Sequence, residues 1–490
     1  MANPDRLSAL DASFLHLEEG GAHMHVASVM VFEGEPPGYD ELVEAVECRL
    51  HLVPRYRQRI AEAPLGLGRQ RWIDDPRFNL EYHVRHTALP SPGSEEQLRN
   101  LVSRIYSQQL DRSKPLWELW LVEGVHDGSW ALITKTHHAL IDGISGVDLA
   151  TVMFDLTPVP REVEHPDRPW QPHREPAGVD LLASGIRGAL RTGIEVLERA
   201  VESVSHPVRT VDTAREAVEG IGEVVWATLN PAPDTPLNVP IGPHRRFVGV
   251  RGRLSDFKLV KDAFGGTVND VVLAGVAGGL RRWLKLRGVR TEGLELRALV
   301  PVSLRTEAEQ GELGNRIAAM RGPLPVYIAD PVERLRTVSA AMQDLKTSKQ
   351  ALGAEVLAGM QNFAPPTILA QATRMNFSTR FYNLLVTNVP GPQVPVYALG
   401  CRLERVFPVP FLAGDRSLAI AVMSYDGGMN FGLLADYDAM PDLDALAEGV
   451  EASLAELVAL AGAGPLSRRR PRSTRTRERA RAKRAAATSD

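Results

Sequence analysis

The sequence of 490 residues lacks the features that mark several large classes of protein. It has only two cysteines, Cys48 and Cys401, too few for a disulfide framework or a zinc cluster. So few cysteines are typical of a protein in the reducing cytoplasm. No run approaches the ~18 apolar residues of a membrane-spanning helix, and the N-terminus lacks the apolar core of a signal peptide. The longest apolar stretch, residues 271–280, contains three glycines and predicts a buried helix. We therefore expect any membrane contact to be peripheral.

Net charge is small but unevenly distributed. The whole chain carries −4, yet residues 468–484 hold ten Lys or Arg and one acid, Glu478. This segment contributes +9, so the rest of the chain carries −13. A body this acidic is a poor candidate for nucleic-acid binding. The basic tail, residues 465–490, is expected to be disordered and solvated, although its charges would also favour an anionic lipid surface.

The hydrophobic pattern indicates two mixed α/β units with a helical connector between them. With 44% hydrophobic and 24% charged residues, the composition is that of a soluble globular protein of two to four domains. The first unit is placed at residues 1–175. Its expected elements are strands at 26–32 and 130–136 and helices at 40–52, 96–110 and 147–156.

The connector is placed at residues 176–244 and the second unit at residues 245–464. Two units of similar size suggest a cleft between them, a common place for ligands. The connector carries one apolar stripe, made by Leu182, Ile186, Leu190, Ile194, Leu197 and Val201. The second unit is expected to have a helix at 268–283, strands at 296–302 and 383–387, a hairpin of 418–423 with 431–435, and a last helix capped by Asp442.

One short segment carries residues suited to acid–base chemistry. It reads His137-His138-Ala-Leu-Ile-Asp142-Gly143 and follows a predicted strand, so its two histidines should point in opposite directions. A histidine can accept a proton near neutral pH. Asp142 can buttress the turn or orient a ring, and Gly143 permits a tight backbone. On this segment alone, a structural role is almost as strong an interpretation as a catalytic one.

Rival chemistries lack their signatures. The stretch from Gly143 to Gly146 is one residue too short for the Gly-x-Ser-x-Gly elbow of a serine hydrolase. The sequence has no Walker A loop and no Gly-x-Gly-x-x-Gly loop. No further ligand with metal-site spacing lies near the histidine pair. We therefore expect no metal and no bound cofactor.

The histidine segment matches the HHxxxDG motif of the superfamily that contains chloramphenicol acetyltransferase, carnitine acyltransferases and peptide-synthetase condensation domains. Further segments resemble the bacterial wax ester synthase/diacylglycerol acyltransferase branch, and together they cover the chain from residue 7 to about 460. These segments are Leu-Ser-Ala-Leu-Asp at 7–11, Phe-Leu at 14–15, Met-His-Val at 24–26, Val-Pro-Arg-Tyr-Arg at 53–57, Pro-Leu-Trp at 115–117, Asn-Asp at 269–270, Pro-Val-Ser-Leu-Arg at 301–305, Gly-Asn-Arg at 314–316 and Asn-Val-Pro-Gly-Pro at 388–392.

The resemblance implies two chloramphenicol-acetyltransferase-like domains with an active-site tunnel at their interface. It implies direct transfer, without an acyl-enzyme, from the co-substrate acyl-CoA to diacylglycerol or a long-chain fatty alcohol. The protein would be cytoplasmic and peripherally associated with a membrane or lipid-body surface. Two alternatives stay open: a condensation-type acyltransferase that uses carrier-bound substrates, and a lipid-body coat protein that has lost activity.

The resemblance also assigns roles to single residues. It makes His138 the general base and His137 its support. Asp142 is expected to form a structural ion pair, with Arg305 as its partner, although a surface position for Arg305 is equally compatible with the sequence. Asn269 is expected either to bind substrate or to cap the helix that follows it. The remaining expected substrate-binding residues are Pro115, Leu116, Trp117, Asp270 and Ser303.

Overall fold

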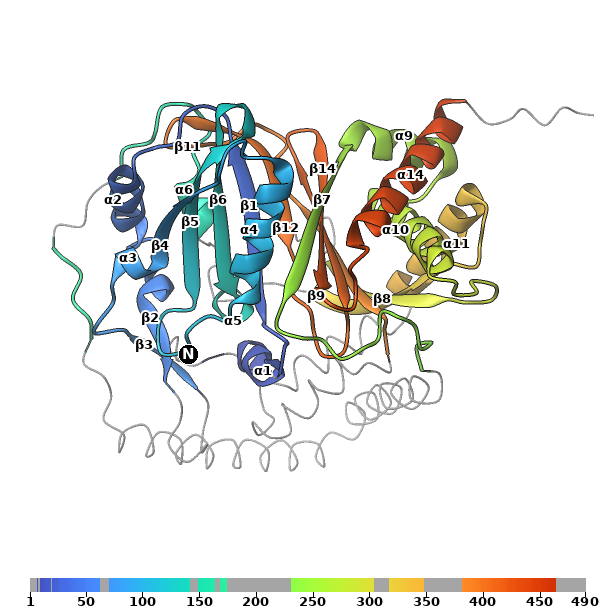
Figure 1. The fold of residues 1–490 in the computed structure, drawn as a ribbon, viewed down its shortest axis with the longest axis horizontal. Coiled ribbons are helices and arrows are strands. Elements are labelled where there is room, and N and C mark those ends of the chain that lie inside the picture. The colour runs from blue at the N-terminus through green and yellow to red at the C-terminus, as the bar shows by residue number, and fades with distance from the viewer. Residues whose placement is uncertain are drawn as a thin grey trace, which may run out of the picture.

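The computed structural model describes residues 7, 9–18, 20–61, 70–141, 149–163, 168–173, 231–303, 317–347 and 381–463. Its strands form two six-stranded sheets that stand side by side, with α4 between them and most of the other helices on the outer sides (Figure 1). Asp142, Gly143, Arg305, the stripe of the connector and the basic tail lie outside the described residues.

The first sheet has the strand order β11-β12-β1-β6-β5-β4. Its neighbours pair antiparallel except β4 with β5, which are parallel. The strands are β1 (His25–Phe32), β4 (Val84–Ala88), β5 (Trp117–Val125), β6 (Ser129–His137), β11 (Tyr397–Ala398) and β12 (Cys401–Val409). Around it lie α1 (Ala9–Leu17), α2 (Tyr39–Arg49), α3 (Leu80–His83), α4 (Glu95–Ser107), α5 (His138–Ile141), α6 (Leu149–Met153) and the small hairpin β2 (Gln58–Ala61) and β3 (Arg71–Asp74).

The second sheet has the strand order β7-β14-β13-β10-β8-β9. Its strands are β7 (Arg245–Arg253), β8 (Leu296–Ser303), β9 (Ile317–Leu324), β10 (Leu384–Pro390), β13 (Leu418–Tyr425) and β14 (Gly428–Asp436). The helices α9 (Leu254–Phe264), α10 (Val268–Leu286), α11 (Pro331–Thr347) and α14 (Leu443–Gly462) cover its outer face (Figure 1). Their apolar residues and those of the sheet form one buried core.

Glycines let the two longest helices of this layer approach closely. A Cβ atom on Gly279 would lie 2.5 Å from Val450 Cγ2, and one on Gly275 would lie 2.4 Å from Leu454 Cδ2. Both distances are shorter than real contacts, so α10 must have glycine where α14 crosses it. The three glycines of residues 271–280 are thus part of a buried helix, as predicted.

Most of the predicted elements are present, with three differences. The helix expected at 147–156 is described only as the five-residue α6. Asp442 stands at the N-cap position of α14, but its carboxylate accepts from Arg287 (Nε–Oδ2 2.9 Å) instead of capping the backbone, so the predicted capping role is wrong. The third difference concerns the division of the chain at residue 245. Strands β11 and β12 follow that boundary but pair in the first sheet, where β12 lies against β1.

A third apolar cluster fills the space between the two sheets. It combines α4 with residues of both sheets, among them Val29 of β1 and Phe247 of β7. In β7, Gly249 faces the Phe407 ring of β12, and a Cβ atom there would lie 2.8 Å from that ring. The two sheets are therefore joined by a packed interior, and β12 connects the halves of the chain because it follows residue 245 in sequence but pairs in the first sheet.

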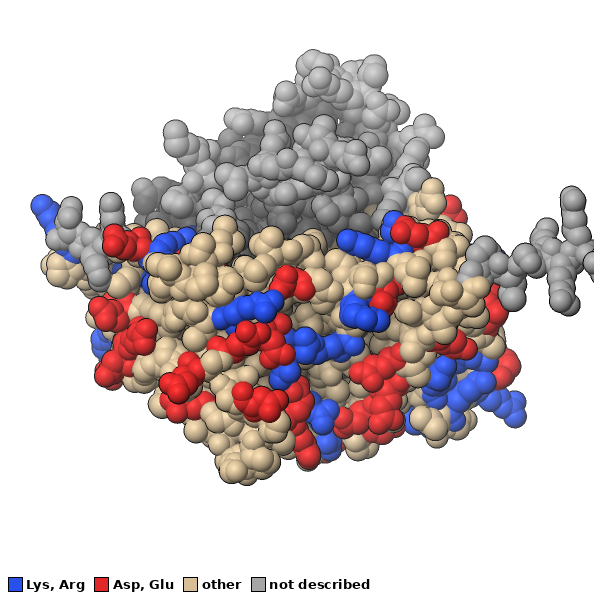
Figure 2. Space-filling view, turned by 90° about the horizontal axis from the view of Figure 1, so that it is seen from above, with Lys and Arg blue, Asp and Glu red and all other residues tan. Residues whose placement is uncertain are grey.

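On the surface in Figure 2, acidic and basic side chains are interspersed over the described residues. This face has no continuous basic stripe of the kind that follows a nucleic-acid backbone. Within the described ranges, no single helix is long and apolar enough to cross a membrane. The consecutive helices α9 and α10 together reach that length and apolarity, but they are bent by 97° where they meet.

Candidate active site

The histidine pair lies where β6 ends and α5 begins. The backbone N–H of His137 donates to the carbonyl of Leu116 (3.0 Å), and that of His138 donates to the carbonyl of Met24 (2.8 Å). Two of the segments that carry the family resemblance, Met-His-Val and Pro-Leu-Trp, thus flank the pair. These backbone bonds fix the direction in which each ring leaves the strand.

The ring of His138 is held between two aromatic side chains. It stacks on Phe14 of α1, with ring centroids 4.0 Å apart and planes at 30°, and meets Phe411 edge-on at 5.5 Å and 85°. Phe411 follows β12, the strand that the second half of the chain contributes to the first sheet. The ring is half-buried, and the two contacts restrict its rotation.

The ring of His137 points the other way and is only 1% exposed. Its Nδ1 accepts a hydrogen bond from the N–H of Ala139 (3.1 Å), so the proton of the neutral ring must sit on Nε2. Burial, followed by the charge of Arg112, lowers the pKa of His137 to about 3. His137 therefore stays neutral throughout the ordinary pH range, which suits a supporting residue better than a base.

A buried carboxylate lies beside His137. Glu18 follows α1, and its side chain is 2% exposed. Its Oε2 accepts two hydrogen bonds from Arg112 (Nη2 2.6 Å, Nε 2.9 Å), and Arg112 also donates to the carbonyl of Leu15 (2.8 Å). Its Oε1 faces the Met24 N–H (3.4 Å) and His137 Nε2 (3.8 Å). One carboxylate oxygen of Glu18 thus binds Arg112, and the other faces His137.

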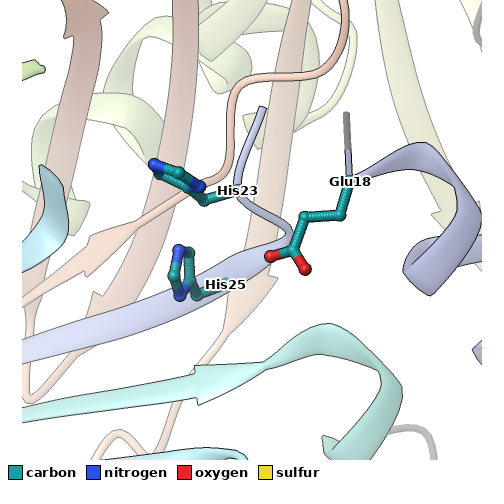
Figure 3. A group of neighbouring side chains, drawn as sticks. All are labelled: Glu18, His23 and His25. Carbon is teal, nitrogen blue, oxygen red and sulfur yellow. The ribbon is translucent and has the colours of Figure 1, made fainter. Parts of the chain in front are cut away.

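Two further buried histidines adjoin Glu18 (Figure 3). Burial and then the charge of Arg245 lower the pKa of His23 to about 4, and burial and then Lys135 hold the pKa of His25 well below its usual range. Both rings are buried, and neither nitrogen of His25 forms a hydrogen bond with a described residue.

Donor atoms of Glu18, His23 and His25 lie within 4.8 Å of one another, the donor types of a metal site. The charges around them oppose a cation: Arg112 already binds the carboxylate, and Lys135 and Arg245 act on the rings. We therefore assign no metal to this group.

Of the expected substrate-binding residues in the first half, Leu116 and Trp117 are part of the core between the first sheet and α2. The indole N–H of Trp117 donates to the carbonyl of Tyr56 (2.7 Å), and its ring stacks on His83 at 4.6 Å. Pro115 is also buried. The segment contacts the site through the Leu116 carbonyl, while its described side-chain contacts are those of packing.

The expected residues of the second half lie at the start of α10 and the end of β8. Thr267 and Asp270 form the capping box of α10, and the Asp270 carboxylate also accepts from Ser339 Oγ (3.1 Å). The capping alternative for Asn269 is therefore wrong. Its side-chain oxygen instead accepts from Asn388 Nδ2 (3.4 Å), which joins two segments of the family resemblance. Ser303 is the last residue of β8, and its side chain is outside the described set.

Sequence reasoning did not assign roles to Phe14, Glu18, Arg112 and Phe411. Phe14 lies in a segment that carries the family resemblance, so the sequence marks its position but does not show that it contacts His138. Arg112 stands three residues before Pro115 but belongs to no motif, and Glu18 has no pattern around it. Their proximity to the histidines depends on contacts between residues about a hundred positions apart, which local patterns do not encode.

Comparison with known proteins gives consistent matches. The catalytic-domain model of the wax ester synthase/diacylglycerol acyltransferase family matches residues 7–272, and the model of that family's C-terminal domain matches residues 313–458. A putative diacylglycerol O-acyltransferase of Mycobacterium tuberculosis is 35% identical over 468 residues, covering 93% of this chain and 90% of the relative. The probable diacylglycerol O-acyltransferase tgs1 of the same organism is 34% identical over 471 residues, covering 95% and 98%.

Solved structures agree on the fold. The wax ester synthase/diacylglycerol acyltransferase from Marinobacter aquaeolei VT8 superposes with a TM-score of 0.65 at 29% identity, covering 93% of this chain and 100% of that one. A trichothecene 15-O-acetyltransferase from Fusarium sporotrichioides superposes with a TM-score of 0.58 at 13% identity, covering 93% and 94%, which speaks for the fold alone. The expected fold class, two mixed α/β acyltransferase-like units, is confirmed.

Proposed function

The chain belongs to the wax ester synthase/diacylglycerol acyltransferase family and is an acyltransferase, and from that premise we propose that it transfers an acyl group from acyl-CoA to the hydroxyl of diacylglycerol. Long-chain fatty alcohols would be a second acceptor. Acyl-CoA is a co-substrate in this proposal, and no cofactor takes part.

The proposed base is His138. Its ring accepts the proton of the acceptor hydroxyl, and the oxygen attacks the thioester carbonyl. The carbon–sulfur bond then breaks, the thiolate of coenzyme A leaves, and the proton passes from His138 to the sulfur. The observation that carries this assignment is the half-buried ring held between Phe14 and Phe411, beside a His137 that is buried and neutral.

Other roles in the proposal rest on the family motif. Asp142 would pair with Arg305 and hold the turn that Gly143 permits. Pro115, Leu116 and Trp117 would shape the wall near the histidines from behind, as their packing suggests. Asn269 would meet substrate together with Asn388, while Asp270 would act by fixing the start of α10. Ser303 remains a proposed substrate contact.

The direct test is an assay of the purified protein with palmitoyl-CoA and either dipalmitoylglycerol or hexadecanol, with release of the thiol as the signal. Acceptor-dependent thiol release is expected with dipalmitoylglycerol. Activity only on an acyl group loaded on a carrier protein would support the condensation-type alternative. No transfer to any acceptor, with binding to lipid bodies retained, would support the inactive coat protein.

We also propose that the protein binds lipid surfaces peripherally, because its proposed acceptors are insoluble. The ten basic residues of the tail would attract anionic lipid, each by ~1 kcal/mol, within a Debye length of ~8–10 Å. Deleting residues 465–490 should weaken binding to anionic vesicles at low salt and leave turnover of detergent-dispersed substrate nearly unchanged. Equal vesicle binding by the shortened protein would leave the apolar stripe of the connector as the remaining candidate.

A further inference from the structure

A chain of contacts connects a surface arginine to the backbone that carries His138. Arg112 binds Oε2 of Glu18, Oε1 of Glu18 faces Nε2 of His137, and Nδ1 of His137 receives the N–H of Ala139 in the first turn of α5. We propose that Glu18 and Arg112 are positioning residues of the reaction, whose opposed charges hold His137 and balance the electrostatic field at the histidine pair. This inference rests on the proposed function, since it takes His138 to be the base.

The positional part of the argument starts from the proton on His137. Because Nδ1 accepts from the Ala139 N–H, the ring N–H on Nε2 points to the side of Glu18. The distance of 3.8 Å from Nε2 to Oε1 is longer than a hydrogen bond. In free enzymes such catalytic contacts are often long and tighten when substrate binds. If the distance between His137 Nε2 and Glu18 Oε1 shortened to that of a hydrogen bond, the bond would fix the ring of His137. Through the Ala139 N–H it would also fix the turn that carries His138.

The electrostatic part concerns the balance of charge. Arg112 is the charged side chain that most lowers the pKa of His137, second only to burial. Glu18 carries the opposite charge and contacts both Arg112 and the histidine. A neighbouring cation disfavours a protonated imidazole and a neighbouring carboxylate favours it. Glu18 and Arg112 therefore act on the histidine in opposite directions, and removal of either one leaves the charge of the other unopposed.

Other charged groups near the pair have partners of their own. Lys135 of β6 donates to the carbonyl of Ile105 at 3.0 Å and lies 3.8 Å from Glu118. Arg245 of β7 lies 3.9 Å from Asp436. The rings of His23 and His25, whose pKa values are lowered, also face this region. Tyr106 lies beside His25, with ring centroids 5.6 Å apart, and a buried carboxylate, Asp11, lies on α1. Glu18 and Arg112 are the opposite charges that lie against His137 in the chain of contacts, so removing either should change the field at its ring.

The consequence is a pair of opposite shifts in the pH dependence of the rate. In Glu18→Gln the charge of Arg112 is unopposed, so protonation of the catalytic pair is disfavoured. In a plot of kcat against pH, the acid limb is the part where kcat rises as the base loses its proton. This acid limb should then move to lower pH by about one unit, and the plateau of kcat should fall because the base is weaker. In Arg112→Gln the carboxylate is unopposed, and the acid limb should move to higher pH.

The experiment measures kcat and KM against pH with palmitoyl-CoA and hexadecanol for the full-length protein and four variants. The double variant Glu18→Gln/Arg112→Gln should return the acid limb to within a few tenths of a unit of the wild type. Arg112→Lys keeps the charge and should leave the limb in place. KM for palmitoyl-CoA should stay within about twofold, because neither residue is proposed to touch substrate. A purely structural role would lower activity without moving the limb in opposite directions.

A matched control is available in the ion pair of Arg287 with Asp442, which also joins one arginine to one carboxylate by two hydrogen bonds (2.5 and 2.9 Å). Asp442→Asn should leave the acid limb unmoved. If Glu18→Gln does not fold, Arg112→Gln and Arg112→Lys still test the sign, because the Arg112 side chain is 40% exposed.

Shifts in the same direction, or unmoved limbs in both single variants, would overturn the inference. Its failure can be told apart from failure of the proposed function. If His138→Ala retains near-normal turnover, His138 is not the base and the proposed function fails in its mechanism. If His138→Ala is inactive while the limbs do not move, only the roles of Glu18 and Arg112 are rejected.

Discussion

The two six-stranded sheets are both packed against helices, but they differ in the side chains that they bury. All 13 histidines of the chain lie between residues 16 and 244, and the part that builds the second sheet has none. At one end of the first sheet, His25, Lys135 and His137 are buried side by side with Glu18. Behind the second sheet, α10 is buried almost along its whole length among apolar side chains. The second part also buries ionisable groups, among them Arg334 and Asp436, but none of them is a histidine. Buried ionisable groups are costly unless paired, and a cluster of buried histidines is a candidate for a functional site.

The second half still contributes to the site of the first. Strand β12 crosses to pair with β1, and Phe411 beyond it touches the His138 ring. In the proposed function the two sheets therefore differ in role: the first carries His138, the proposed base, and the second is an apolar scaffold. The segment after β12, from the second half of the chain, supplies Phe411 beside the ring. Each prediction below acts on one side of this division.

The largest expected effect is that of His138→Ala. Loss of a general base typically lowers the rate ~10²–10⁴-fold, and a half-buried ring at the end of a strand contributes little to the fold. We expect kcat to fall by that factor with an unchanged melting temperature. Steady-state thiol release and calorimetry on the same preparation measure both. Activity above about a tenth of wild type at normal stability would reject His138 as the base.

The opposite pattern is expected for Trp283→Ala in the second unit. The Trp283 side chain is 0% exposed in the core of the α10 layer, and truncating such a residue costs ~3–5 kcal/mol of unfolding free energy. Below its unfolding temperature the variant should keep nearly normal kcat. Leu286→Ala on the same helix, at a position 73% exposed, is the control and should have little effect on either quantity. A large loss of kcat in folded Trp283→Ala would contradict the division of roles.

Acid should destabilise the first unit before the second. Burial lowers the pKa of His23 and His83 to about 4 and that of His137 to about 3, below the ~6.5 of an unfolded chain. The unfolded state then binds more protons, so the stability from these groups is complete above pH ~6.5 and declines as the pH falls toward 4. Hydrogen exchange at pH 7.5 and 5 should show protection lost first in peptides of β1, β5 and β6. Equal loss in both sheets would argue against the comparison.

A smaller catalytic effect is expected for His137→Ala. Its ring lies behind the proposed base and accepts the Ala139 N–H in the first turn of α5. The loss of kcat should stay below the ~10²-fold that marks removal of a general base. Rate measurements on the two alanine variants, His137→Ala and His138→Ala, decide the matter. A greater loss for His137→Ala would reverse the two roles.

The sequence predicts the elements of the fold well because their periodicity is local. The strand ending at His137, the helix at α10 and the hairpin of β13 and β14 all have clear patterns, and the HHxxxDG motif marks the segment of the proposed base. The pairing of β12 with β1 was not predictable in this way. It pairs Ala27 with Val409, far apart in the sequence, and the residue pattern of neither strand indicates which strand it pairs with.

The supporting residues of the site show the same limit. Glu18 and Arg112 meet because α1 and the turn after α4 converge on the end of β6. Asn269 was read as a possible cap because asparagine favours that position, but Thr267 two residues earlier forms the capping box with Asp270. In each case a three-dimensional contact or a competing neighbour decides the role, and a single sequence does not show either.

The central claim is that His138 activates the acceptor directly, so that the acyl group never resides on the protein. The most direct test is rapid-mixing measurement of thiol release from palmitoyl-CoA, with and without dipalmitoylglycerol, at enzyme concentrations comparable to the substrate. Direct transfer predicts no burst of thiol without the acceptor and acceptor-dependent release with it. A burst equal to the enzyme concentration in the absence of acceptor, with the palmitoyl group found on the protein, would contradict the account.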